Sequence, residues 1–280
     1  MSDALRIAHG AFGRVALLDM DRPLVRHAHP HCHVLLKVEG ADTHFIVGND
    51  IAPLTSTNAV LIDGWKPHAY VHQPGQPRSL ILALYIEPNW LKEFRPGWAA
   101  SGAPGFFGTS DGEISPRIRT LTLRLAADMM SSPERTAAHE ATLSDLMVAV
   151  IERFTRWRAS DSLIRNMSLP AFDRRIRKAA ETIRSQEGPS ASMDDIARQS
   201  GLSRAHFFRL FESSIGVPPR VFSNVVRMEK AVAAVLHQDA PVAEISDQLG
   251  FPEPSHFTRF FTNHAGVGPR EFRTVSRLAS

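Results

Sequence analysis

Seven of the 13 histidines in this 280-residue chain lie between positions 27 and 72. They are His27, His29, His31, His33, His44, His68 and His72. Alternate side chains of an extended segment share a face, so the spacing predicts that His29, His31 and His33 point the same way. Together with His68 and a carboxylate such as Glu39, neutral imidazoles of this kind can bind a divalent metal such as Zn, Fe, Mn or Ni. The alternative, which we favour on the sequence, is that the histidines have structural roles or bond to a small molecule.

The chain's single cysteine, Cys32, lies between two of these histidines. One cysteine excludes an intrachain disulfide. We predict that Cys32 is a small packed side chain, and metal or redox chemistry is the alternative.

A second chemically informative pattern is an internal repeat in the C-terminal part. The pattern His-Phe-x-Arg-x-Phe occurs at 206–211 and again 50 residues later at 256–261, and each copy runs on into Gly-Val-x-Pro-Arg. Each copy therefore places an arginine, Arg209 or Arg259, at the same position. The planar guanidinium can bond a guanine edge through two hydrogen bonds, so the pair indicates that the repeat reads DNA. An α-helical module that binds protein is the alternative.

The repeat requires a helix, a tight turn and a second helix in each copy. In the first copy, Ser192 and Ser203 are suited to capping two helices, and Gly201 is suited to the turn between them. In the second copy, Gly250 ends the first helix and Pro254 suits the first turn of the next. The apolar residues between positions 219 and 237 predict one helix that connects the two copies.

With these motifs, residues 172–275 resemble the AraC/XylS family of transcription regulators, and 250–272 are similar to its signature. The resemblance implies two recognition helices that enter adjacent major-groove segments about one helical turn apart. The positions that it assigns to DNA contact are Ser203, Arg204, Ala205, Phe208 and Arg209 in the first helix, and Pro254, Ser255, Thr258 and Arg259 in the second. Ala205 and Phe208 depart from the larger or more polar residues often found there. We therefore expect the second helix to determine most of the specificity.

The N-terminal part contains short runs typical of strands, at 15–18, 34–38, 43–47, 59–62 and 79–86. Apolar residues then recur at helical spacing over 118–129 and 143–157, and predict two amphipathic helices. Their apolar stripe either packs on its own domain or forms a dimer. The resemblance implies a cupin-like barrel that senses a small molecule, followed by helices that make a homodimer.

The predicted fold is therefore a multidomain α+β chain. It comprises a cupin-like ligand-sensing barrel (1–98), a helical dimerisation region (113–158), a linker (159–170) and an all-α DNA-binding domain with two helix-turn-helix motifs (171–276). The candidates for effector binding are His29, His31, His33, Trp65 and His68. The candidates for the divalent metal are His29, His31, His33, Glu39 and His68.

Composition is typical of a soluble globular protein, with 43% hydrophobic and 22% charged residues. No apolar run is long enough to span a membrane and no signal peptide is visible, so we predict a cytoplasmic protein without a membrane partner. The net charge of +3 is too small to identify a DNA-binding protein by itself.

The predicted function is a transcription regulator, and not an enzyme, because no nucleophile with a paired base and no pair of catalytic carboxylates stands out. Its expected partners are a double-stranded DNA operator, a small-molecule or metal effector, and RNA polymerase. The alternatives are a ligand-independent regulator and a metal-binding cupin enzyme fused to a DNA-binding domain.

Overall fold

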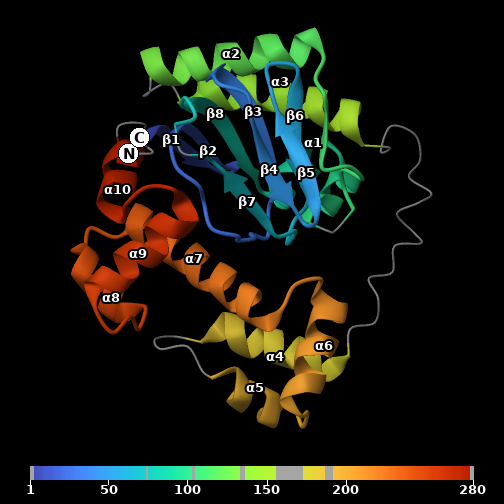
Figure 1. Ribbon diagram of the computed structural model, residues 1–280, viewed down its shortest axis with the longest axis vertical. Coiled ribbons are helices and arrows are strands. Elements are labelled where there is room, and N and C mark those ends of the chain that lie inside the picture. Colours follow the sequence, from blue (N-terminus) through green and yellow to red (C-terminus); the bar gives the residue numbers. More distant parts are fainter. Residues whose placement is uncertain are drawn as a thin grey trace. The chain divides into compact units, whose positions relative to one another are not determined.

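The computed structural model describes residues 3–73, 75–102, 105–132, 136–155, 173–186 and 192–277 (Figure 1). The chain divides into two compact units, Met1–Asp161 with Glu271–Ser280 and Ser162–Arg270. The predicted linker at 159–170, and the end of the preceding helical region at 156–158, lie outside the described residues.

The N-terminal part contains nine strands among its described residues. They are β1 (Asp3–Gly10), β2 (Gly13–Met20), β3 (Cys32–Gly40), β4 (Thr43–Val47), β5 (Asp50–Leu54), β6 (Asn58–Ile62), β7 (His68–Val71), β8 (Ser79–Ile86) and β9 (Asp111–Glu113). All five predicted runs fall within β2, β3, β4, β6 and β8. The other four escaped prediction because β7 and β9 have only 4 and 3 residues, β5 contains Pro53, and β1 has few strong strand formers.

These strands form two antiparallel sheets. The larger has the order β1-β2-β8-β3-β6-β9 and the smaller has the order β5-β4-β7. Within the described ranges neither sheet closes on itself, because β1 and β9 are edges of the larger sheet and β5 and β7 are edges of the smaller. The expected cupin-like barrel is therefore corrected to a pair of sheets, and the α+β class is confirmed.

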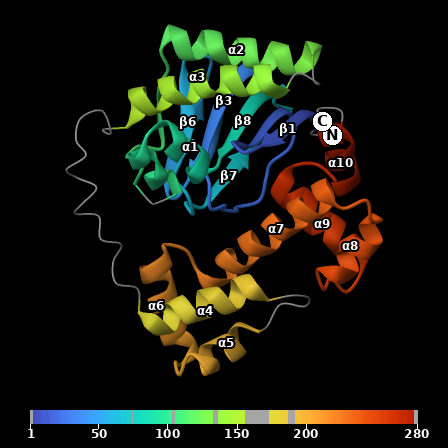
Figure 2. The same ribbon diagram turned by 180° about the vertical axis from the view of Figure 1, so that it is seen from behind.

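Four helical segments follow or connect these strands. They are α1 (Pro88–Phe94), a short 3-10 helix η1 (Pro96–Gly102), α2 (Pro116–Ser131) and α3 (Thr136–Phe154). The helices α2 and α3 pack against each other and lie over the larger sheet (Figures 1 and 2).

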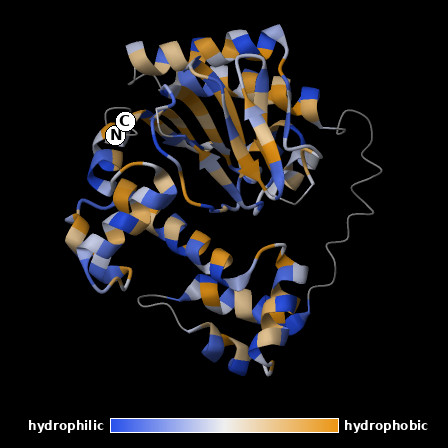
Figure 3. Cartoon of the chain, viewed as in Figure 1, coloured by the Kyte–Doolittle hydropathy of each residue, from blue (hydrophilic) through white to orange (hydrophobic). Residues whose placement is uncertain are grey.

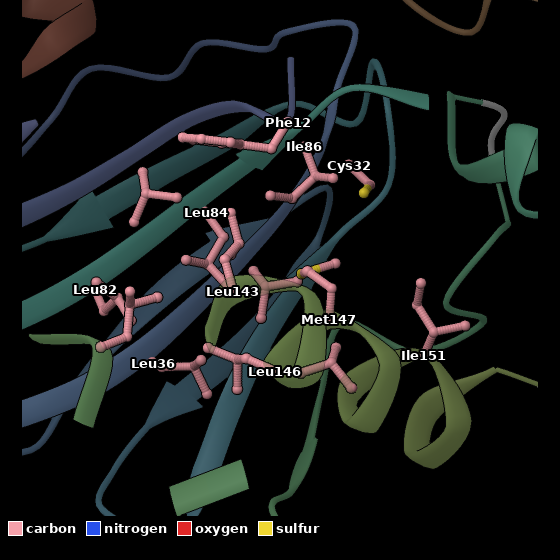
Figure 4. Close-up of a cluster of buried hydrophobic side chains, with 14 of the residues drawn as sticks. Phe12, Cys32, Leu36, Leu82, Leu84, Ile86, Leu143, Leu146, Met147 and Ile151 are labelled. Carbon is pink, nitrogen blue, oxygen red and sulfur yellow. The ribbon is translucent and has the colours of Figure 1, made fainter. Parts of the chain in front are cut away.

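The core of this part lies between the larger sheet and α3. Side chains of β3 and β8, such as Leu36 and Leu84, point toward Leu143 and Met147 of α3 (Figure 4). Consecutive residues are buried at 32–36 of β3 and 81–86 of β8, so both faces of these strands are covered there. The apolar stripe of the two helices packs inside its own unit, and it is not available as an interface between two chains.

The C-terminal part consists of helices. They are α4 (Arg174–Ser185), α5 (Met193–Gln199), α6 (Arg204–Ile215), α7 (Pro219–His237), α8 (Val242–Gln248), α9 (Pro254–Ala265) and α10 (Pro269–Arg277). Two helix-turn-helix motifs, α5-α6 and α8-α9, are joined by α7, as predicted. In Figure 3 apolar residues concentrate along the strands, whereas polar and apolar residues alternate along these helices. No described helix has the length and apolar character needed to cross a membrane.

Candidate functional site

Hydrogen bonds at the helix ends define the first helix-turn-helix motif. The Ser192 hydroxyl accepts from the Asp195 amide at 3.1 Å, and the Ser203 hydroxyl accepts from the His206 amide at 3.4 Å. Gly201 has a φ of +65°, in the left-handed region where a side chain is unfavourable. The predicted caps and turn are confirmed.

The second helix of this motif, α6, buries one face and exposes the other. Phe207 and Phe211 are fully buried, whereas Ala205 and Arg209 are exposed. Phe208 is only half-exposed, and its ring lies 5.3 Å from the Arg204 guanidinium.

Two of the polar positions assigned to DNA contact in α6 also have structural partners. Arg204 forms an ion pair with Asp194 on α5, and Ser203 caps the helix. Arg209, by contrast, is paired with no acidic residue in the described part of the chain. It is therefore the arginine that α6 presents to solvent without an acidic partner among the described residues.

The second motif turns at Gly250, which has a φ of +67°. Pro254 begins α9, and Ser255 donates a hydrogen bond to Glu253 at 3.1 Å. Thr258 and Arg259 are exposed, as are Pro254 and Ser255. The outer face of α9 thus presents two hydroxyls and one guanidinium.

Phe260 on α9 is only half-buried, whereas Phe257 and Phe261 of the same helix are fully buried. Its ring instead lies 5.3 Å from that of Phe251 and 4.3 Å from that of His264. The first contact joins α9 to the turn between α8 and α9, and the second lies within α9.

The connecting helix α7 supplies a residue that sequence reasoning missed. Arg227 donates hydrogen bonds to the carbonyls of Leu249 and Gly250, each at 3.2 Å, and its guanidinium lies 3.5 Å from the Phe251 ring centroid. At the other end of the domain, Lys230 donates to the Gln186 carbonyl at 2.6 Å. Side chains of α7 therefore satisfy carbonyls at the ends of α8 and α4. An arginine inside a helix predicted only as a connector gives no local signal of this role.

A cluster of buried histidines lies in the N-terminal unit. His27, His29 and His68 each place one ring nitrogen within 4.8 Å of a ring nitrogen of the other two. The first two come from the segment before β3, and His68 begins β7. Backbone bonds fix this arrangement, because His27 and His68 exchange N–H···O bonds of 2.9 and 2.8 Å and the Trp65 amide donates to the His29 carbonyl at 2.7 Å.

Backbone carbonyls fix the orientation of these rings. The Nδ1 atoms of His27, His29 and His68 lie 2.8, 3.1 and 3.0 Å from the carbonyls of Val25, His31 and Lys66. A carbonyl only accepts, so each Nδ1 must donate, and in the neutral ring each Nε2 then has a lone pair.

His33, on β3, packs beside these three histidines. Its Nδ1 lies 3.0 Å from His29 Nε2, and its ring stacks on Tyr85 with centroids 4.0 Å apart. Because His29 Nε2 has the lone pair, His33 must be the donor. The Nε2 atoms of His33 and His68 are buried and have no hydrogen-bond partner among the described residues.

Burial keeps these rings neutral. It holds the pKa of His29 and of His33 well below 6.5, and the neighbouring histidine charges lower both further. Burial also lowers the pKa of His68 to about 4, despite the opposing hydrogen bond to the Lys66 carbonyl. His29, His33 and His68 are therefore uncharged imidazoles near neutral pH.

Two residues of the predicted metal set lie elsewhere. His31 points to Glu87, with Nε2 and Oε1 2.8 Å apart, and this hydrogen bond lowers the pKa of Glu87. Glu39 is exposed six positions beyond His33 on β3, a separation of about 20 Å along a strand. The alternation argument failed because β3 begins at Cys32, so it does not apply to His29 and His31. His27 takes their place in the cluster.

The other predicted residues of this region are placed as follows. Trp65 is half-buried with a φ of +67°, one residue after Gly64 in the loop before β7. Cys32 is fully buried, and burial raises the pKa of its thiol to about 12. The expectation that Cys32 is a packed side chain is confirmed.

The C-terminal part matches a known protein family. Residues 196–274 match the family described as a helix-turn-helix domain. The lactose operon transcription activator of Staphylococcus xylosus is 26% identical over 79 residues, which are 28% of each protein. The Msm operon regulatory protein of Streptococcus mutans is 30% identical over 109 residues, or 39% of this chain and 37% of that protein. The alignments thus span 28% and 37% of the lengths of these two regulators.

Solved structures share the fold over nearly the whole chain. An apo variant of ToxT from Vibrio cholerae has a TM-score of 0.58 at 14% identity, with coverage of 96% of this chain and 99% of that one. Wild-type ToxT with a bound unsaturated fatty acid has a TM-score of 0.53 at 14% identity, with coverage of 94% and 95%. At this identity the likeness establishes a common two-part architecture of sheets and helices.

Proposed function

We propose that this chain, whose residues 196–274 form a helix-turn-helix domain of the AraC type, is a sequence-specific DNA-binding transcription regulator. The observation that supports this most strongly is the pair of helices α6 and α9. Each buries two phenylalanines at the same positions and exposes an arginine between them, Arg209 or Arg259. A helix that exposes an arginine on its outer face suits the major groove, where a guanidinium can bond a guanine edge.

The two helices would then read adjacent segments of one operator. In α9, Pro254, Ser255, Thr258 and Arg259 would face the bases, and the hydroxyls would bond base edges or phosphates. In α6, Arg209 would contact a base, while Ala205 and Phe208 would offer apolar contacts. Ser203 and Arg204, already bonded within the domain, would contribute phosphate contacts at most.

The N-terminal unit would control this activity by binding a small molecule. We assign the buried, neutral side chains of His29, His33 and His68 to the effector site, together with the neighbouring Trp65. We place His31 at the edge of this site, because its ring is hydrogen-bonded to Glu87. An effector can shift the regulator only if it binds one arrangement of the chain more tightly than another. The effector would thereby change operator occupancy or contact with RNA polymerase.

The outer side of α2 is the surface that we assign to a homodimer. Leu123 and Met130 are 41% and 44% exposed, and Ala127 between them is exposed as well. Residues spaced by four and three positions share one face of a helix, so these side chains form an exposed apolar surface that is separate from the buried stripe of α2.

The test of DNA binding is selection of sites from random duplex DNA by the full chain, followed by footprinting. We expect a single consensus in which two protected major-groove segments lie about one helical turn apart. Equal recovery of all sequences, or one protected segment only, would contradict the proposal.

A further inference from the structure

Two buried histidines of the N-terminal unit each have a ring nitrogen that makes no hydrogen bond to the described residues. His33 Nε2 and His68 Nε2 have no hydrogen-bond partner in the described chain, and these residues are 3% and 1% exposed. A buried polar atom without a hydrogen-bond partner is unfavourable. Such atoms, gathered in one place, require an explanation.

We propose that His27, His29 and His68 form a binding site for one divalent first-row transition metal ion, of which Zn²⁺ is the probe we choose. Imidazole nitrogen is a ligand that these ions prefer. The set differs from that expected from sequence, because it contains His27 and excludes His31, His33 and Glu39.

The hydrogen bonds of these rings are those of metal ligands. A metal-binding histidine usually donates its other ring N–H to a carbonyl or carboxylate, which fixes the ring and directs the lone pair to the ion. All three rings have this bond, to the carbonyls of Val25, His31 and Lys66. The backbone pairing of His27 with His68 fixes two of them relative to each other.

The distances permit coordination after a small movement. The ring nitrogens of the three histidines lie within 4.8 Å of one another. In a tetrahedral site with Zn–N bonds of about 2.1 Å, two ligand nitrogens are about 3.4 Å apart. Binding at His29 would exchange the hydrogen bond from His33 for a coordinate bond. His33 thus lies beside the site and is not one of its ligands.

Charge determines what completes the site. Three neutral imidazoles leave the two positive charges of the ion uncompensated in a buried place, where an isolated charge is unfavourable. A fourth position for hydroxide, or for an anionic group of a small molecule, would reduce this charge. Among the described residues, no carboxylate belongs to the group that gathers at this site.

The test is metal analysis of the full chain, purified without a histidine tag and loaded with Zn²⁺. We expect one Zn²⁺ per chain after exhaustive dialysis, and a large loss of bound metal in His27→Gln and His68→Gln. Two matched controls, His44→Gln and His72→Gln, remove histidines of the same region outside the site and should keep the ion.

A measurement on the unaltered protein covers the case in which a variant does not fold. X-ray absorption of the Zn²⁺-loaded chain should show three imidazoles at about 2.0–2.1 Å. Fewer than three imidazoles, absence of bound Zn²⁺ in the unaltered chain, or undiminished binding in folded His68→Gln would each overturn the proposal.

Discussion

At the scale of single residues, the two recognition helices differ in what they offer to DNA. In α9, Ser255, Thr258 and Arg259 are exposed and polar, whereas α6 exposes Arg209 beside Ala205 and a half-buried Phe208. Each well-placed bidentate contact discriminates between bases by about 1–3 kcal/mol. We therefore expect most of the specificity to come from the half-site that α9 reads.

Replacement of Arg259 by alanine tests this directly. We expect Arg259→Ala to weaken operator binding by about 1–3 kcal/mol, or roughly 5- to 150-fold, and to relax the preference at one base pair. Arg209→Ala should act in the same way at the other half-site. The measurement is fluorescence anisotropy at fixed salt, with Arg117→Ala, an exposed arginine of α2, as the control. Wild-type affinity and base preference in both variants would refute the assignment.

The Cys32 thiol provides a second prediction at this scale. Because burial raises its pKa to about 12, its thiolate fraction at pH 8 is roughly a thousandfold smaller than that of a free thiol. We expect no measurable alkylation of the native chain and rapid alkylation once denaturant unfolds it. The measurement is mass spectrometry after timed exposure to iodoacetamide, and rapid labelling of native protein would show that the thiol is accessible.

At the scale of elements, α7 determines how well the second motif is held. Arg227 satisfies two carbonyls at the end of α8 and stacks on Phe251, so one side chain joins the connecting helix to the turn before α9. Hydrogen bonds from a charged donor each contribute about 1.5–3 kcal/mol. The orientation of α9 therefore depends on a residue outside the proposed set of DNA contacts.

We expect Arg227→Ala to lower the free energy of unfolding by about 2–4 kcal/mol, because it leaves two carbonyls without their donor. Arg227→Lys should retain part of the stability, since an ammonium cannot reproduce the planar contact. Urea unfolding of the full chain measures both, and Arg220→Ala, an exposed arginine of the same helix, is the matched control. Equal stability of Arg227→Ala and the control would contradict this role.

At the scale of the whole molecule, the apolar side chains of α2 divide between two roles. Ile118, Leu125 and Met129 pack in the core of the N-terminal unit, and Leu123 and Met130 point away from it. The first set stabilises the fold and the second is available to a second chain. In the proposed homodimer, association and folding would therefore use different faces of one helix.

We expect Leu123→Asp to shift the protein toward monomer without loss of fold, because a charge replaces an apolar contact at the proposed interface. Sedimentation velocity measures the shift, and circular dichroism checks the fold. Ile51→Asp, at an apolar residue that is 71% exposed on β5, is the matched control. A dimer unaffected by Leu123→Asp, or a wild-type chain that is monomeric at all concentrations, would contradict the proposed interface.

Short-range patterns in the chain were enough to predict the two helix-turn-helix motifs of the C-terminal part. Capping serines, the turn glycines Gly201 and Gly250, and buried phenylalanines at helical spacing act within a few residues of one another. Each of these local patterns therefore predicts its turn or helix without information about the rest of the fold. Five strands were predicted for the same reason, since their apolar runs mark them locally.

Contacts between distant segments were decided by the tertiary structure alone. His27 meets His68 because two backbone segments 41 positions apart pair, and Arg227 reaches Leu249 because α7 packs beside α8. The side-chain types were visible in the sequence, but spacing along the chain does not encode such distances. The closure of the barrel was mispredicted for the same reason, because edge strands are defined by partners that no local pattern specifies.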